Sequence, residues 1–217
     1  MECWRCGTAI PHDGVRPDFC AVCQALLAPD PARSHFGWLD LSPRFSYDLD
    51  HLAARHRKRL RRFHPDRYHG QGEVAWRHAV AHATAINDAW RALSDPQKRL
   101  EYLLKLHGAA LPPATFDPAG QIAMDPIHQI EMAELSTALA ELDGVDAHTE
   151  RTAIGRQVAH QYARELDRIG GEIDAALDGD GLDGAAPIWQ AAVSRLRSLR
   201  SLLLRLDAEF PFGQGAP

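Results

Sequence analysis

The chain has 217 residues, of which 45% are hydrophobic and 24% are charged, and its formal net charge is −5 at pH 7. This composition is typical of a soluble globular protein, and the length suits one or two domains with a real hydrophobic core. No stretch approaches the roughly 20 uncharged apolar residues that a membrane helix needs. Cys3, Arg5 and Cys6 lie where a secretory signal would have its apolar core, so we expect a cytoplasmic protein with no membrane partner.

All four cysteines lie near the start of the chain, in two Cys-x-x-Cys pairs: Cys3 with Cys6, and Cys20 with Cys23. Two such pairs predict a tetrahedral site of four thiolates, and zinc is favoured because it accepts this ligand set and is redox-silent. The alternatives are disulfides, which a reducing compartment disfavours, and a redox pair, which would sit within a βαβ pattern that is absent here. We expect a module at residues 1–30 whose folding energy comes from structural zinc.

Residues 48–93 predict two helices that pair as an antiparallel hairpin. Asp48 is the expected N-cap of the first helix, and Pro65 ends it near Phe63 because proline disfavours the helical conformation of the residue before it. A second helix is expected at about 73–93, and Leu49 and Trp76 belong to the apolar stripes that should face each other. The rest of the first helix carries six cations: Arg55, Arg57, Lys58, Arg59, Arg61 and Arg62.

The remainder of the chain also predicts helices, so the expected fold class is all-α. Asp95 and Pro96 indicate the start of a helix that ends at about Gly108. Residues 109–118 contain three prolines and mark a domain boundary. Three more helices are expected at about 126–142, 147–177 and 185–210, joined by short turns as an up-down-up bundle.

The tripeptide His64-Pro65-Asp66, in the turn between a basic helix and an apolar partner helix, resembles the signature of a J-domain. The flanking residues Trp38-Leu39, the stretch from Thr84 to Trp90 and the stretch from Arg99 to Gly108 narrow the resemblance to the HscB (Hsc-twenty) family of co-chaperones of iron–sulfur cluster assembly. An N-terminus that starts Cys-Trp-x-Cys is similar to the metal-binding members of this family. The resemblance implies a J-domain at 35–108 and a scaffold-binding three-helix domain at 119–211.

The resemblance also implies two partners and no enzymatic activity of the chain itself. The J-domain docks on a DnaK/HscA-class (heat-shock seventy) chaperone and stimulates its ATPase, and the C-terminal bundle binds the iron–sulfur scaffold IscU. The fixed backbone of proline presents the side chains of His64 and Asp66 at a set separation. A cationic helix steers an acidic partner, and the cations expected to contribute most are Arg57, Lys58, Arg61 and Arg62.

On the first C-terminal helix, the family's scaffold-contacting face corresponds to Ile127, Ile130, Glu131 and Glu134. These four side chains share one helix face, although Ile127 and Ile130 could instead belong to the core. Ser198 stands where the family often has an aromatic residue, which puts one scaffold contact in doubt. The metal modules could also pair two protomers, so a homodimer stays open.

Three other functions are weighed against this one. A J-protein of another pathway is disfavoured in its commonest form, because the Gly/Phe-rich region and the repeated CxxCxGxG units are absent. A zinc-dependent nucleic-acid-binding protein is disfavoured because the chain is net acidic and its aromatic residues are not interleaved with the cations. A catalytic metal is the least expected alternative, because four thiolates leave no open coordination position.

Overall fold

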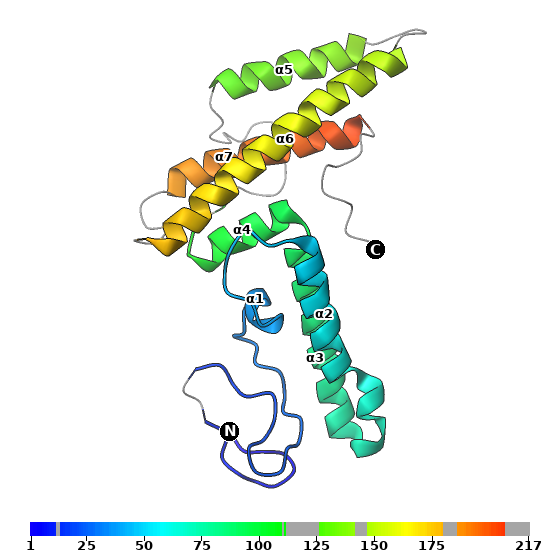
Figure 1. The fold of residues 1–217 in the computed structure, drawn as a ribbon, viewed down its shortest axis with the longest axis vertical. Helices are drawn as coiled ribbons and strands as arrows, with labels where there is room; N and C mark the ends of the chain where they lie inside the picture. Colours follow the sequence, from blue (N-terminus) through cyan, green and yellow to red (C-terminus); the bar gives the residue numbers. More distant parts are fainter. Residues whose placement is uncertain (12–13, 110, 112–125, 142–146, 180–185, 207–217) are drawn as a thin grey trace. The chain divides into compact units, whose positions relative to one another are not determined.

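The structure is a computed structural model that describes residues 1–11, 14–109, 111, 126–141, 147–179 and 186–206. The described residues form α-helices and two short 3-10 helices, with only two isolated β-bridges, Glu2↔Ala9 and Phe19↔Leu26. The expected all-α fold class is therefore confirmed. The helices are α1 (His35–Trp38), α2 (Leu49–Phe63), η1 (Pro65–Arg67), η2 (His69–Gln71), α3 (Glu73–Leu93), α4 (Pro96–Leu106), α5 (Pro126–Glu141), α6 (Ala147–Asp178) and α7 (Ala186–Arg205) (Figure 1).

The chain divides into two compact units. The first comprises Met1–Pro43 and Tyr47–Ser94, and the second comprises Arg44–Ser46 and Asp95–Pro217. The short segment Arg44–Ser46 therefore packs with residues that lie far downstream in the sequence. The functional ranges 1–30, 35–108 and 119–211 stay predictions, because this division follows packing and groups α4 with the C-terminal helices.

In the first unit, α2 and α3 lie side by side as an antiparallel hairpin (Figure 1). The Asp48 carboxylate accepts a hydrogen bond from the His51 N–H at 3.2 Å, as an N-cap does, and His64 ends α2 in an extended conformation. The interior of this unit is formed by fully buried large side chains: Phe36, Leu39, Leu52, Phe63, Ile86 and Leu93.

Two residues of the predicted apolar stripes are exposed instead. Leu49 is the first residue of α2 and is 46% exposed, because no earlier helical turn covers it. Trp76 is 42% exposed, whereas Ala75 and Ala79 are buried. Successive helical residues point about 100° apart, so the helix face defined by the two alanines turns Trp76 toward solvent.

In the second unit, α7 lies against α6 and also contacts α5 and α4. The buried face of α7 includes Trp189, Val193, Leu196, Leu199 and Leu203, and Leu206, which directly follows the helix, is buried as well. Pro96 begins α4, and the Asp95 carboxylate caps it by accepting from the Lys98 N–H at 3.1 Å. The observed ends of α4, α5 and α6 lie within two residues of the ends predicted from the sequence.

Polar contacts join α4 to the long helices of the second unit. Arg200 donates to both Asp95 oxygens at 3.0 and 2.7 Å, and Arg197 donates to both Glu101 oxygens at 2.9 and 2.8 Å. The buried hydroxyl of Tyr162 donates to Gln97 Oε1 at 3.0 Å. These bidentate and buried bonds fix the orientation of α4 within its unit.

Several predictions fall outside the described residues: most of the proline linker at 109–118, the end of the last expected helix beyond residue 206, and the side chain of Ile127. Among the helices that the structure describes, none combines the length and the apolar character needed to cross a membrane.

Candidate functional site

The four cysteines converge from two loops of the same geometry. In the first loop the Gly7 N–H donates to the Cys3 carbonyl at 2.9 Å, and in the second the Gln24 N–H donates to the Cys20 carbonyl at 3.0 Å. Gly7 and Gln24 occupy equivalent positions after the second cysteine of each pair, and both are left-handed, with φ of 72° and 56°. Glycine adopts this conformation without steric cost, whereas glutamine adopts it rarely, so the sequence gives no comparable sign of the second turn.

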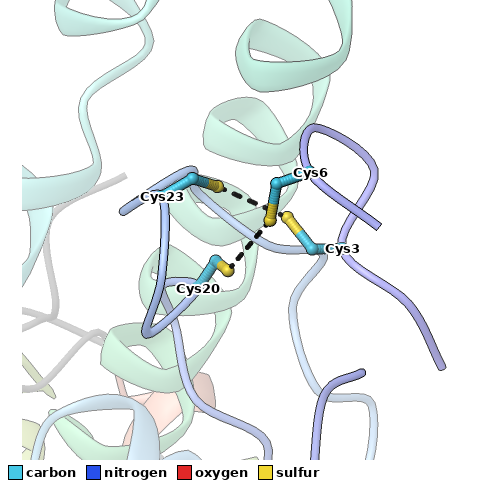
Figure 2. A group of neighbouring side chains, drawn as sticks. All are labelled: Cys3, Cys6, Cys20 and Cys23. Atoms are coloured by element: carbon cyan, nitrogen blue, oxygen red, sulfur yellow. Dashed lines mark hydrogen bonds between the residues drawn. The ribbon is translucent and has the colours of Figure 1, made fainter. Parts of the chain in front are cut away.

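The sulfur positions match a tetrahedral metal site. The four Sγ atoms lie within 4.8 Å of one another, with 3.6 Å between Cys3 and Cys23 and 3.7 Å between Cys6 and Cys20 (Figure 2). Four thiolates at about 2.3 Å from a central ion define a tetrahedron with edges of about 3.8 Å. The donor set and its spacing therefore fit one metal ion held by Cys3, Cys6, Cys20 and Cys23.

The local environment shifts the pKa values of Cys6, Cys20 and Cys23 in different directions. Hydrogen bonds with Thr8 lower the pKa of Cys6 to about 6, and those from the Cys23 and Val22 N–H groups lower the pKa of Cys20. The Ala25 N–H lowers the pKa of Cys23, but burial and the three neighbouring sulfurs outweigh it and raise that pKa to about 12. A divalent cation stabilises all four thiolates together and removes this conflict.

The second cysteine loop is joined to the helical hairpin by buried polar contacts. His82 is fully buried and its Nε2 lies 3.0 Å from the Leu27 carbonyl, while Asp18 pairs with Arg33 at 2.6 Å and with Arg59 at 3.2 Å. Burial lowers the pKa of His82. Because a carbonyl oxygen only accepts, the ring donates to Leu27 through its Nε2–H. The cysteine module and the hairpin are thus parts of one packed unit.

Arg59 was expected among the cations on the face of α2 opposite its apolar stripe, but the structure buries it. Its side chain is only 4% exposed, its Nε donates to the Trp38 carbonyl at 2.9 Å, and its guanidinium also lies 3.4 Å from Asp40. The partly buried carboxylate of Asp18 offsets the cost of desolvating this charge. Of the six cations on α2, Arg59 is the buried one, and the partly buried Arg55 likewise donates to the Leu39 carbonyl at 2.9 Å.

The His64-Pro65-Asp66 corner is exposed and held in one shape. The side chains of His64 and Asp66 are 49% and 87% exposed, and His64 Nδ1 lies 3.5 Å from Asp66 Oδ2. The Arg67 N–H donates to the His64 carbonyl at 3.0 Å, and the Tyr68 N–H donates to the Pro65 carbonyl at 2.9 Å. The buried ring of Tyr68 anchors the far side of the turn, where its hydroxyl donates to the Arg62 carbonyl at 3.1 Å.

The expected chaperone-facing cations lie on α2, the helix that ends at this corner. Arg57, Lys58, Arg61 and Arg62 are all exposed. Arg67 adds a further exposed cation in η1, immediately after the tripeptide, which the sequence reading missed although the residue adjoins the motif. The corner and these side chains together form a positively charged, pre-shaped surface.

On α5, the described residues of the predicted scaffold face are exposed or, at Glu131, partly exposed. Ile130 is 59% exposed, so it is not a core residue, and Glu134 is also exposed. Glu131 pairs with Arg195 of α7 at 3.7 Å. These acids lie along a groove that also has cations from α6 and α7, which the sequence did not indicate: Arg164, Arg168 and Arg195.

The first unit combines an exposed proline-fixed corner on an antiparallel hairpin with a tetracysteine module, and long helices make up most of the second unit, so the chain is of an all-helical class built from two compact units. No family model matches the chain. The chain is 36% identical over 155 residues to the human iron–sulfur cluster co-chaperone protein HscB, a match that covers 70% of this chain and 63% of the human protein.

A second relative is covered almost completely. The chain is 32% identical over 168 residues to a co-chaperone protein HscB homolog of Vibrio vulnificus, covering 77% of this chain and 89% of that protein. Among solved structures, human HscB matches with a TM-score of 0.77 and 28% identity over 95% of this chain and 97% of that chain, and HscB of Vibrio cholerae with 0.62 and 26% over 80% and 95%. The chain belongs to the HscB co-chaperone family.

Proposed function

We propose that this chain is a co-chaperone of iron–sulfur cluster assembly in the cytoplasm. In this proposal it stimulates the ATPase of a DnaK/HscA-class chaperone through His64, Pro65 and Asp66, and it binds an IscU-type scaffold through α5. The chain itself catalyses no reaction. The observation that carries the proposal is the exposed, hydrogen-bonded corner at the end of a cationic helix, in a chain that belongs to the HscB family.

The corner suits a docking role because little order has to be created on binding. Two backbone hydrogen bonds and the proline ring already fix the turn, so the entropy lost on association is small. The four exposed cations raise the rate of encounter with an acidic surface, over a screening length of about 8 Å at physiological salt. Specific contacts then come from the imidazole and the carboxylate.

The α5 face suits a partner that is both apolar and basic. Ile130 offers an exposed apolar anchor beside the carboxylates of Glu131 and Glu134. Apolar contacts flanked by charges are typical of protein interfaces. Together with Ile127, these residues form the proposed scaffold contact.

The proposed metal is structural zinc. Four thiolates fill its coordination shell, so it supplies folding energy and no reaction centre. Elemental analysis of the purified chain should find one zinc per chain. Whether the metal modules also pair two protomers into a homodimer is decided by sedimentation of the zinc-loaded protein.

The deciding experiment is a single-turnover ATPase assay with a DnaK/HscA-class chaperone, with and without IscU. The wild-type chain should stimulate hydrolysis, and IscU should increase the effect. His64→Gln should abolish stimulation with the fold intact, because the side chain is half exposed and contributes no core packing. His69→Gln, an exposed histidine of the same loop, is the matched control and should leave stimulation unchanged. Stimulation retained by His64→Gln would refute the proposal.

A further inference from the structure

Phe19 links the tetracysteine module to the proposed chaperone-docking corner. It immediately precedes the ligand Cys20, and its ring stacks on Phe63 with 5.8 Å between centroids and 19° between planes. Phe63 is the last residue of α2 and immediately precedes His64. The contact between these two rings therefore connects Cys20, which adjoins Phe19, to His64, which adjoins Phe63.

The same ring also holds one of the docking cations. The Arg62 guanidinium lies 4.8 Å from the centroid of Phe19 and 5.5 Å from that of Phe63. A guanidinium over an aromatic face is attracted by the ring quadrupole, even at an exposed site. The cysteine module thus supplies an aromatic ring that restrains the long side chain of Arg62, which would be flexible without it.

The backbone of Phe19 is fixed on both sides. On one side the Cys20 N–H donates to the Ala25 carbonyl at 2.9 Å, which closes the second cysteine loop. On the other side the Leu27 N–H donates to the Asp18 carbonyl at 2.9 Å, and the Asp18 carboxylate pairs with Arg59 of α2. The Phe19 ring therefore has a defined position relative to α2 once the cysteine loop is closed.

We propose that Phe19 is a positioning residue for chaperone docking: it holds the Arg62 guanidinium in place beside the His64-Pro65-Asp66 corner. The tetracysteine module is then a built-in support of the docking surface and not an independent appendage. This inference rests on the proposed function of the corner. Its physical basis is that a side chain ordered before binding loses less entropy when the partner arrives.

The test is a double-mutant cycle on ATPase stimulation with the zinc-loaded full chain. Phe19→Leu keeps an apolar side chain but removes the aromatic face, and should raise the half-saturating concentration about two- to fivefold, the equivalent of a surface cation–π contact, with maximal stimulation unchanged. Phe19→Tyr keeps the ring and should behave as wild type. In an Arg62→Ala background, Phe19→Leu should have no further effect. Val22→Ala, an exposed residue of the same cysteine loop, is the matched control.

An unchanged half-saturating concentration in Phe19→Leu, or full effects of both substitutions in the double variant, would overturn the inference. If the leucine variant loses its metal, Phe19→Met carries the same test with a more adaptable side chain. NMR order parameters of the Arg62 Nε–H decide the question independently of activity, because they should fall in Phe19→Leu and stay high in Phe19→Tyr and Val22→Ala. A wild-type chain that stimulates no ATPase would refute the proposed function, while unchanged order parameters would refute the positioning role alone.

Discussion

Two adjacent glycines of α6 are expected to respond in opposite directions to the same substitution. A Cβ built on Gly170 would lie 1.9 Å from Cδ1 and 2.0 Å from Cε1 of the Phe45 ring, whereas a Cβ on Gly171 would meet nothing within 4 Å. Alanine is favoured over glycine inside a helix by about 1 kcal/mol. Gly171→Ala should therefore stabilise the C-terminal unit by about 1 kcal/mol.

Gly170→Ala gains the same helix propensity but forces an overlap that the structure cannot easily relieve. The Phe45 N–H donates to the Asp174 carboxylate at 2.6 Å, the Ser46 N–H donates to the other oxygen at 2.8 Å, and Arg99 lies over the ring at 5.2 Å. Overpacking of this kind costs about 3 kcal/mol at the upper end of its usual range. We expect a net destabilisation of about 2 kcal/mol, and a difference of about 3 kcal/mol between the two variants.

Urea unfolding followed by circular dichroism at 222 nm, together with calorimetry, measures both variants under the same conditions. A Phe45→Ala background supplies the control, because removal of the ring should turn Gly170→Ala into a stabilising change. Equal stability of Gly170→Ala and Gly171→Ala in the wild-type background would refute the packing argument.

Three further predictions concern metal, charge and scaffold binding. Chelation of the metal should unfold residues 1–30 and leave α6 and α7 helical by circular dichroism; loss of the whole helical signal would contradict the assignment of the metal to a local module. Burial raises the pKa of Asp95, but hydrogen bonds from Arg200 and Lys98 outweigh it and leave this pKa below its usual range. Its ionised form therefore contributes stability that is present above about pH 4 and lost as the pH falls through the lowered pKa, so Asp95→Asn, which keeps the helix cap, should flatten the acid limb of a stability–pH curve. Replacement of Ile130 and Glu131 by alanine should weaken IscU binding roughly five- to tenfold by calorimetry without change in ATPase stimulation, whereas Ile188→Ala, an exposed isoleucine of α7, should leave binding unchanged.

The sequence predicted features whose causes are local. Helix boundaries are set by side-chain caps at Asp48 and Asp95 and by proline rings at Pro65 and Pro96. The structure has a helix boundary at each of these positions. The two Cys-x-x-Cys pairs likewise carry their geometry in their spacing, and the sulfur atoms do converge.

Features that depend on distant partners were not predictable in the same way. The sequence placed Arg59 with the exposed cations, because nothing near it reveals that Asp18, 41 residues upstream, neutralises it in the interior. The cations of the α5 groove come from two other helices, and Gly170 gives no sign in the sequence that it receives a ring from residue 45. Tertiary packing decides each of these cases, and helical periodicity does not encode it.

The packing of the Phe45 ring against Gly170 also has a consequence for folding during synthesis. Phe45 leaves the ribosome 125 residues before the glycine that receives it. At a synthesis rate of roughly 5–20 residues per second, this gap corresponds to about 6–25 s in which the nascent chain carries an uncovered phenylalanine. Translation must therefore reach α6 before this early segment finds its partner, so the C-terminal unit is completed only when nearly the whole chain has emerged.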